Sequence, residues 1–92
     1  MQSKNKPAMS QAERAHLERV KSLACSLCDA PPPSDAHHIK QGAHFSAVAL
    51  CKDCHQNSRL GWHGERRMWA IKKMDEHDAL YVTVRRLQEA RL

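Results

Sequence analysis

The chain has 92 residues, which is enough for one domain, and its aromatic residues are limited to two Trp, one Tyr and one Phe. A domain of this size buries only about 60% of the surface of its unfolded chain, so it usually needs a disulfide or a metal ion to stabilise its core. No apolar stretch approaches the roughly 20 residues of a transmembrane helix, and the polar start of the sequence argues against a secretory signal peptide. A cytoplasmic, reducing location is therefore expected, and there the four cysteines favour a metal site over disulfides.

The net charge is +5, and the positive charge lies toward the two ends of the sequence. Residues 1–24 carry five basic and two acidic side chains, and residues 61–92 carry seven basic and five acidic ones. Residues 25–60, in the centre, carry three of each. Basic flanks around a neutral centre favour a polyanionic partner such as single- or double-stranded DNA, and a solvated surface rich in Lys and Arg is the alternative.

The first part of the chain is predicted to hold a leader and one helix. Residues 1–9 are polar and basic, and we expect a disordered leader there. Ser10 and Glu13 match the S-x-x-E capping box, which predicts that a helix over residues 10–24 starts at this point. This helix is expected to cover one face of the metal-binding centre as an appendage, so His16 is interpreted as a surface or packing residue rather than a ligand. The basic side chains that it would offer to DNA are Arg14, Arg19 and Lys21.

The centre of the chain is predicted to form a β-hairpin and a short helix. Residues 36–39 and 47–50 are the candidate strands, and Gln41-Gly42 between them is a turn signal. Residues 54–59 are able to form a short helix after the second strand. The chemistry-bearing residues of the sequence lie in and beside these elements.

Residues 65–92 are predicted to form two helices, the second of which Asp75 would cap. The residues expected to face the core from the first helix are Met68, Trp69 and Ile71. The residues that share one face of the second helix are Leu80, Val84 and Leu87. A strand over residues 81–84 is the alternative, because Tyr, Val and Thr favour strands. The fold class predicted for residues 10–92 is a single small α+β domain.

The four cysteines occur as two C-x2-C pairs that 22 residues separate, and they are Cys25, Cys28, Cys51 and Cys54. This spacing is typical of a closed structural zinc site with four thiolate ligands. Such a site would clamp the start of the hairpin to its end, and metal binding would contribute to the free energy of folding. Four reduced thiols packed as small apolar side chains are the alternative. The zinc site alone does not fix the function, because it occurs in DNA-binding modules, ubiquitin ligases and nucleases alike.

Five of the seven histidines cluster in the centre of the sequence. His37 and His38 are adjacent, so in a strand their side chains point to opposite faces and do not easily bind the same ion. If the chain bends back after the short helix, His55 and His63 converge with His37 on one cation. A scatter of polar surface residues is the alternative, and it is the preferred interpretation for His44, which lies in a loop outside this pattern.

The cysteine and histidine motifs lie in three segments, Cys25-Ser-Leu-Cys28, Ala36-His37-His38-Ile39 and Leu50-Cys51-Lys-Asp-Cys54-His55. In this combination they resemble the HNH group of the His-Me finger (ββα-metal) nucleases, in the variety that carries a four-cysteine zinc site. The later Gly61-Trp-His63-Gly64, the Arg-Arg-Met-Trp after it and the terminal helix are similar to the phage recombination-enhancement nucleases that depend on the RecA recombinase. The resemblance implies a ββα-metal core over residues 25–64, between the N-terminal helix and the helices of residues 65–92.

The resemblance also implies a role for each histidine. His38 falls at the position of the family's general base. The residues that fall at positions binding one divalent cation (Mg²⁺, Mn²⁺, Ni²⁺ or Zn²⁺) are His37, His55 and His63. The family's central Asn lies about five residues before the second cysteine pair, where this chain has Ser46, so Ser46 or a backbone carbonyl would take its place. The basic residues after His63 that are candidates for phosphate contacts are Arg66, Arg67, Lys72 and Lys73.

The leading hypothesis is a metal-dependent DNA endonuclease that hydrolyses phosphodiester bonds, with a structural Zn²⁺ and one catalytic cation. The narrower similarity implies action with a RecA-type recombinase filament, in phage recombination in the cytoplasm of a bacterial or phage-infected host cell. We expect a monomer without membrane association. A non-catalytic zinc-binding module that contacts DNA or a protein is the alternative, but such a module has no need of the additional histidines. An RNA-directed nuclease or a toxin of the same fold also stays open.

Overall fold

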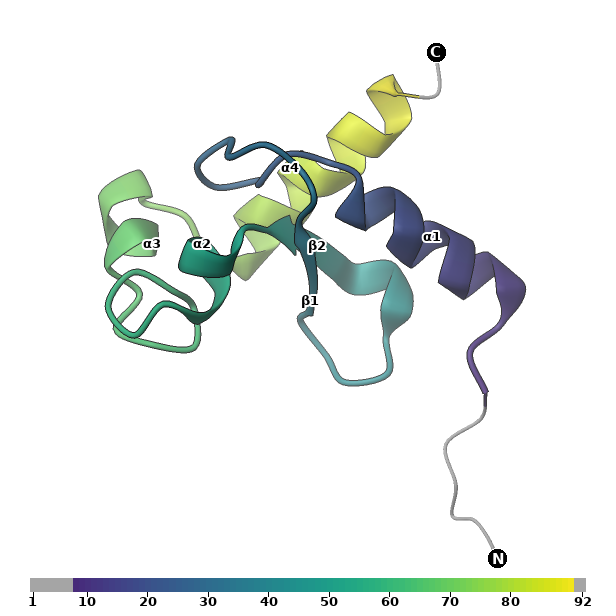
Figure 1. Cartoon of the computed structure of the whole chain (residues 1–92), viewed down its shortest axis with the longest axis horizontal. Helices are drawn as coiled ribbons and strands as arrows, with labels where there is room; N and C mark the ends of the chain where they lie inside the picture. The colour runs from purple at the N-terminus through teal and green to yellow at the C-terminus, as the bar shows by residue number, and fades with distance from the viewer. Residues whose placement is uncertain (1–7, 91–92) are drawn as a thin grey trace, which may run out of the picture.

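The structure, a computed structural model, describes residues 8–90, so most of the predicted leader over residues 1–9 lies outside the described residues. The elements are α1 (Gln11–Lys21), β1 (Asp35–His38), the 3-10 turn η1 (His44–Ser46), β2 (Ala47–Leu50), α2 (Lys52–Gln56), α3 (Arg67–Lys72) and α4 (Glu76–Glu89). Figure 1 shows the hairpin of β1 and β2 between α1 on one side and α2 with α3 on the other, with α4 behind it. This arrangement confirms the predicted small α+β fold.

Helix α1 starts at the predicted capping box. The Ser10 hydroxyl accepts a hydrogen bond from the Glu13 amide at 3.0 Å, and the Glu13 carboxylate accepts one from the Ser10 amide at 2.8 Å. These two bonds satisfy amide groups that have no partner within the helix. The helix ends at Lys21, earlier than predicted, and packs against the rest of the domain through Leu17 and Val20.

The two strands form the predicted antiparallel hairpin, in which Ala36 pairs with Ala49 and His38 with Ala47. Strand β2 is buried along its whole length, whereas His37 is the one buried residue of β1. Gly42 has a φ of +83° in the connecting loop, a backbone conformation that glycine adopts without strain. The hairpin therefore carries His37 into the interior of the domain.

The outer edge of β2 is covered by segments that are distant in the sequence. The Ala49 carbonyl accepts a hydrogen bond from the Ser26 amide at 2.8 Å, and the Ala49 amide donates to the Thr83 hydroxyl at 3.3 Å. Thr83 is fully buried; its hydroxyl also lies 2.7 Å from that of Ser26 and donates to the Ala79 carbonyl at 2.9 Å. Because buried polar groups without partners destabilise a fold, this network fixes α4 against the hairpin.

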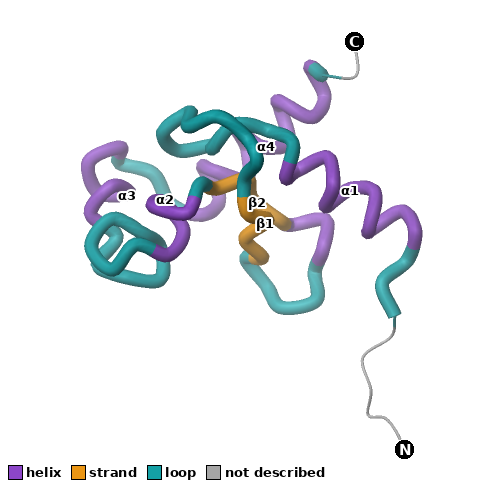
Figure 2. Tube along the Cα trace, viewed as in Figure 1, coloured by secondary structure: helices purple, strands orange, loops and turns teal. Residues whose placement is uncertain are grey.

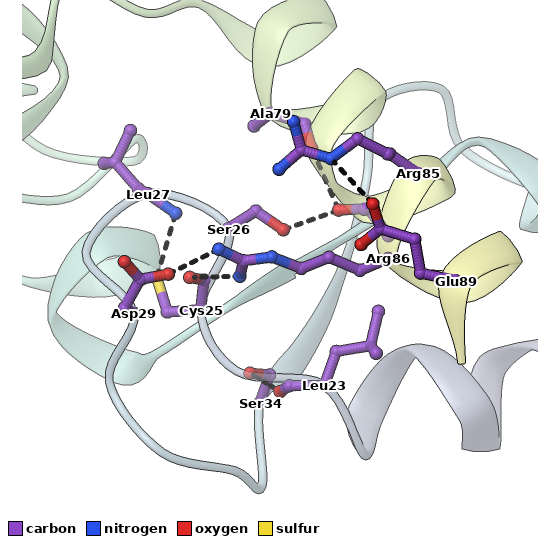
Figure 3. A network of polar contacts seen from close by, with 11 residues as sticks. Leu23, Cys25, Ser26, Leu27, Asp29, Ser34, Ala79, Arg85, Arg86 and Glu89 are labelled. Carbon is purple, nitrogen blue, oxygen red and sulfur yellow. Dashed lines mark hydrogen bonds and ion pairs between the residues drawn. The ribbon is translucent and has the colours of Figure 1, made fainter.

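Helix α4 also holds the loop that carries the first cysteine pair, as Figure 3 shows. The Arg86 guanidinium donates to the Cys25 carbonyl at 3.2 Å and to the Asp29 carboxylate at 2.5 Å. The Ser34 hydroxyl donates to the Leu23 carbonyl at 2.7 Å and so ties together the two ends of the same loop. Figure 2 shows that this segment is loop throughout, so its shape depends on such contacts and on the cysteines.

The last segment is helical, and the alternative of a strand over residues 81–84 is wrong. Asp75 caps α4 as predicted, in a second capping box with Asp78. The reciprocal bonds, 2.9 Å each, start the helix before its β-favouring residues are reached. Tertiary contacts to the hairpin then outweigh the local preference for a strand.

The prediction of which residues of α3 and α4 face the core is partly wrong. Trp69 and Leu87 are buried as expected, but Ile71 is 70% exposed and Val84 is 40% exposed. Thr83 takes the buried position next to Val84, because its hydroxyl is needed at the edge of β2. Helix α3 is too short to bury residues on more than one side, so Ile71 lies on its free face.

The largest core cluster surrounds the cysteines, and its buried members are Cys25, Leu27, Val48, Leu50, Cys54, Trp69 and Ala79. A second, smaller cluster joins α1, β2 and α4 through Val20, Ala49 and Leu87. The core is thus built around the cysteine pairs, as expected for a chain that depends on a metal for stability. Within residues 8–90, no helix combines the length and the apolar character needed to cross a membrane.

Candidate metal centres

The first cysteine pair lies in a tight turn after α1. The Cys25 amide donates to the Ala30 carbonyl at 2.9 Å, and the Asp29 amide donates to the Cys25 carbonyl at 3.0 Å. The Cys25 sulfur accepts a hydrogen bond from the Leu27 amide at 3.4 Å. Asp29 closes the turn with a left-handed backbone, φ +65°, which Asp tolerates better than most residues. The turn directs both sulfurs of the pair toward one point.

The second cysteine pair starts α2. Cys51 is the N-cap of this helix, and its sulfur accepts a hydrogen bond from the Cys54 amide at 3.4 Å. The Cys54 carbonyl accepts the indole N–H of the buried Trp69 at 2.9 Å. The first pair is therefore held by the backbone hydrogen bonds of its turn. The second pair is held by the start of α2 and by the buried side chain of Trp69.

The four cysteine sulfurs lie within 4.8 Å of one another. Two sulfurs bound to one tetrahedral zinc, at about 2.3 Å each, are about 3.8 Å apart. The Sγ atoms of Cys28 and Cys51 are 3.7 Å apart, which fits this separation and is far too long for a disulfide. The arrangement confirms the predicted cluster and is consistent with a structural Zn²⁺.

The pKa values of these thiols are shifted in different directions. Burial alone would raise the pKa of Cys25, but hydrogen bonds from the backbone of Cys51, Cys28 and Leu27 more than offset it, so that pKa is lowered. Burial raises the pKa of Cys28 and of Cys54. A bound cation would favour the thiolate forms of Cys28 and Cys54, because its charge replaces the solvation that these groups lose on burial.

The second centre consists of three histidines that three different elements supply. They are His37 from the middle of β1, His55 from α2 and His63 from the loop after α2, and one ligand atom from each lies within 4.8 Å of the others. The ring centroid of His37 is 5.0 Å from that of His55 and 5.2 Å from that of His63. This grouping confirms the predicted convergence.

His63 reaches this centre because the loop after α2 folds back tightly. The His63 amide donates to the His55 carbonyl at 3.1 Å, and the Trp62 amide donates to the Cys54 carbonyl at 2.9 Å. A Cβ on Gly61 would lie 2.7 Å from the Asn57 nitrogen, and one on Gly64 only 2.4 Å from a backbone oxygen of the same loop. The two glycines therefore permit a close approach of backbones that a larger residue would prevent.

In two of these rings, one nitrogen lies within hydrogen-bond distance of a carboxylate. Nε2 of His37 lies 2.6 Å from Oε2 of Glu76, and Nδ1 of His55 lies 2.9 Å from Oδ2 of Asp35. The other nitrogen of each ring, Nδ1 of His37 and Nε2 of His55, is then available to a cation. Histidine ligands of metal sites commonly have such carboxylate partners, which fix the tautomer and the ring orientation. The sequence analysis missed both Asp35 and Glu76.

The charge states around these rings suit metal binding. Burial lowers the pKa of His37, and the hydrogen bond to Glu76 only partly opposes this effect. Burial would raise the pKa of Asp35, but its hydrogen bond to His55 and its 2.7 Å ion pair with Lys52 lower it. These shifts in pKa favour a neutral His37 ring and an ionised Asp35 carboxylate at neutral pH, which suits a cation site.

His38, the predicted general base, lies beside His37 but pairs with another residue. Its Nε2 is 2.9 Å from Nδ1 of His44, the residue that the sequence analysis assigned to the loop surface. Ser46, expected to replace the family's central Asn, uses its backbone carbonyl to accept the Ile39 amide at 3.4 Å. His44 is a functional candidate that the sequence alone did not indicate, because the folding of the loop brings its ring to His38, six positions earlier.

The candidate phosphate-binding residues are distributed over two surfaces. Arg66 stacks on Trp62, with its guanidinium carbon 3.7 Å from the ring centroid, and donates to the Trp62 carbonyl at 2.7 Å. Arg67 pairs with the neighbouring Glu65. Both arginines, with Lys72 at the end of α3 and Lys73 after it, follow the loop that carries His63. The exposed basic residues of α1 lie on the other side of the hairpin and are Arg14, Arg19 and Lys21.

The chain was compared with family models, with curated proteins and with solved structures, and none of the three comparisons found a match. The assignment of function therefore depends on the two clusters and their surroundings. One centre, with four buried or half-buried thiols, is closed. The other combines buried His37 and half-buried His55 with exposed His63, and it opens to solvent.

Proposed function

We propose that the protein is a metal-dependent DNA endonuclease of the HNH type. The observation that carries this proposal is the convergence of His37 and His55 with the exposed His63, with His38 at the next position of the strand. A structural zinc site uses four protein ligands, whereas a catalytic site keeps a position free for water or substrate. Three imidazoles with one open side match the second case.

The chemistry of phosphodiester hydrolysis fits this set of residues. A divalent cation bound by the three imidazoles would polarise the phosphate and stabilise the negative charge on the departing 3′ oxygen. His38 would accept a proton from the attacking water at Nδ1, the nitrogen that is not paired with His44, as the new bond to phosphorus forms and the bond to the 3′ oxygen breaks. Burial and the nearby His44 lower the pKa of His38, so its ring is neutral and able to accept a proton at pH 7.

Basic residues that follow His63 in the sequence support a nucleic acid as the substrate. Arg66 and Arg67 lie three and four positions after His63, and Lys72 and Lys73 lie at the C-terminal end of α3. Contacts from Lys and Arg to phosphates position a backbone without reading its sequence. We expect little sequence preference, and the similarity to the recombination-enhancement nucleases adds a RecA-type filament as the proposed partner.

The proposal is tested by nicking of supercoiled plasmid DNA, with linear and single-stranded DNA in parallel. Mg²⁺, Mn²⁺, Ni²⁺ and Zn²⁺ are added in turn to protein of known zinc content, with and without a recombinase filament. Wild-type protein should nick with at least one cation. His38→Ala should reduce the rate by about 10²–10⁴-fold, the contribution of a general base. His77→Ala is the matched control, because His77 is an exposed histidine outside both centres.

Two results would contradict the proposal. Unchanged nicking by His38→Ala would remove the assigned base. No cleavage under any condition, together with a single tightly bound zinc per chain, would favour a non-catalytic zinc module instead.

A further inference from the structure

We infer that His44 is the positioning residue for His38, a role that rests on the proposed nuclease function. The inference starts from a direct contact between the two rings, with Nε2 of His38 2.9 Å from Nδ1 of His44. The ring centroids are 5.0 Å apart and the rings are nearly perpendicular, with an interplanar angle of 82°. A hydrogen bond between two imidazoles needs one protonated and one unprotonated nitrogen, so it fixes the orientation of both rings.

The side chain of His38 needs such support because it has no fixed place in the core. His37 is buried and held by Glu76, whereas His38, the last residue of β1, is only half-buried. A freely rotating imidazole would spend much of its time away from a reacting water. The hydrogen bond to His44 selects one orientation of the His38 ring, so the ring stays in place for the reacting water.

The loop that carries His44 is held by backbone hydrogen bonds. The Ala43 amide donates to the Lys40 carbonyl, the Ser46 amide to the Ala43 carbonyl, each at 3.0 Å, and the Ile39 amide to the Ser46 carbonyl at 3.4 Å. These bonds form two consecutive turns that lead into η1. His44 is the first residue of η1, so the turns set the direction from which its ring meets His38.

Helix α1 holds this loop from outside. Phe45, the residue next to His44, packs edge-on against His16 of α1, with ring centroids 5.0 Å apart. Ser46 follows Phe45 in the sequence, and its carbonyl accepts a hydrogen bond from the amide of Ile39, the residue after β1. The helix that the sequence analysis treated as an appendage therefore contacts the loop that orients the proposed base, and His16 serves in packing as predicted.

The contact through Nδ1 of His44 makes the inference testable with three substitutions. His44→Phe keeps the size of the ring but removes both nitrogens. His44→Asn retains a polar atom near the position of Nδ1, and His44→Gln retains one near the position of Nε2 instead. Cleavage rates and KM are measured for each variant at fixed cation concentration, with zinc content and cation affinity determined in parallel. His77→Phe is the control for replacing a histidine elsewhere on the surface.

His44→Phe should lower kcat on the order of 10- to 100-fold, the effect of a misplaced catalytic group, while KM and cation affinity stay near those of the wild type. His44→Asn should recover more of the lost rate than His44→Gln. Equal rates for His44→Phe and wild type would overturn the inference and leave the nuclease proposal intact. Equal rates for the Asn and Gln variants would also overturn it, because a purely structural role does not distinguish the two nitrogens.

A nitrogen NMR measurement tests the same contact without cleavage activity. In ¹⁵N-histidine-labelled wild-type protein, a coupling between Nε2 of His38 and Nδ1 of His44 should be detected across the hydrogen bond and should vanish in His44→Phe. Absence of this coupling in the wild type would reject the pairing. If the coupling is present but no cation supports cleavage, the contact stands, whereas the positioning role fails together with the proposed function.

Discussion

Oε2 of Glu76, in the first turn of α4, lies 2.6 Å from Nε2 of His37, in the middle of β1. This contact joins the C-terminal helix to the histidine centre across 39 positions of the sequence. Two further contacts of α4, from Thr83 to β2 and from Arg86 to the first cysteine pair, lie along the same helix. Helix α4 thus braces both candidate metal centres at once.

Glu76 is expected to tune cation affinity through His37. Glu76→Ala should weaken cation binding about 10- to 100-fold, because the ring loses the partner that fixes its tautomer. Glu76→Gln retains a hydrogen-bonding oxygen and should lose less cation affinity. Isothermal titration with Mn²⁺ measures both, and Glu89→Gln, at the far end of α4, is the control. Equal affinities for Glu76→Ala and the control would show that the carboxylate does not act on the site.

The cysteine centre is expected to be required for folding. Cys54→Ser, or removal of zinc by a strong chelator, should abolish the cooperative thermal transition, because the sulfurs lie inside the largest core cluster. Each kcal/mol lost from the free energy of unfolding lowers the Tm of a domain this small by about 4–8 °C. A loss of several kcal/mol is therefore readily seen by circular dichroism. His63→Ala, which alters only the exposed ligand of the other centre, should keep its zinc and most of its Tm. A Cys54→Ser protein that melts like the wild type would contradict the structural role.

Gly64 is expected to control the position of His63. In Gly64→Ala, the new Cβ would approach the Ser58 carbonyl oxygen to 2.4 Å, so the loop must move and carry His63 away from His55. Cation affinity should fall at least as far as in His63→Ala, while the content of structural zinc stays at one per chain. Gly42→Ala is the control for a strained glycine away from this centre, because its φ is +83° but its Cβ would meet no atom within 4 Å, and it should leave cation affinity unchanged. The prediction fails if Gly64→Ala binds the cation as tightly as the wild type does.

The buried hydroxyl of Thr83 is expected to contribute to stability through its hydrogen bonds. Thr83→Val keeps the shape of the side chain but leaves the Ser26 hydroxyl and the Ala49 amide without a partner. Buried polar groups left unpaired destabilise by about 1–3 kcal/mol each. Urea denaturation should show a loss in this range for Thr83→Val and a smaller one for Thr83→Ser, which keeps the hydroxyl. A Thr83→Val variant as stable as the wild type would show that the network is energetically neutral.

Local signals were sufficient to predict much of the fold. The capping boxes at Ser10 and Asp75 mark the starts of α1 and α4, since each involves residues only three positions apart. The C-x2-C spacing predicted the cysteine cluster, because two-residue turns leave few alternatives for the direction of the sulfurs. The convergence of the histidines required one further assumption, a bend after α2, and the glycines there supply it.

The contacts that sequence analysis missed are long-range, lie in a loop or depend on helix rotation. Glu76 and Asp35 become partners of histidines only after distant elements have packed together. His44 was assigned to the surface because a loop residue shows no periodicity from which its direction could be predicted. Val84 was placed inward from spacing alone, but the need for a hydroxyl at the edge of β2 turns Thr83 into the core instead.

Metal stoichiometry, resolved by centre, tests the account most directly. Cobalt substitution followed by absorption spectroscopy distinguishes a tetrathiolate site, with its intense sulfur-to-metal charge transfer, from a site made of imidazoles. The wild type should bind two ions per chain, one of each kind, and a His37→Ala, His55→Ala double variant should retain only the thiolate-bound ion. One ion per chain in the wild type, with the thiolate spectrum alone, would contradict the account.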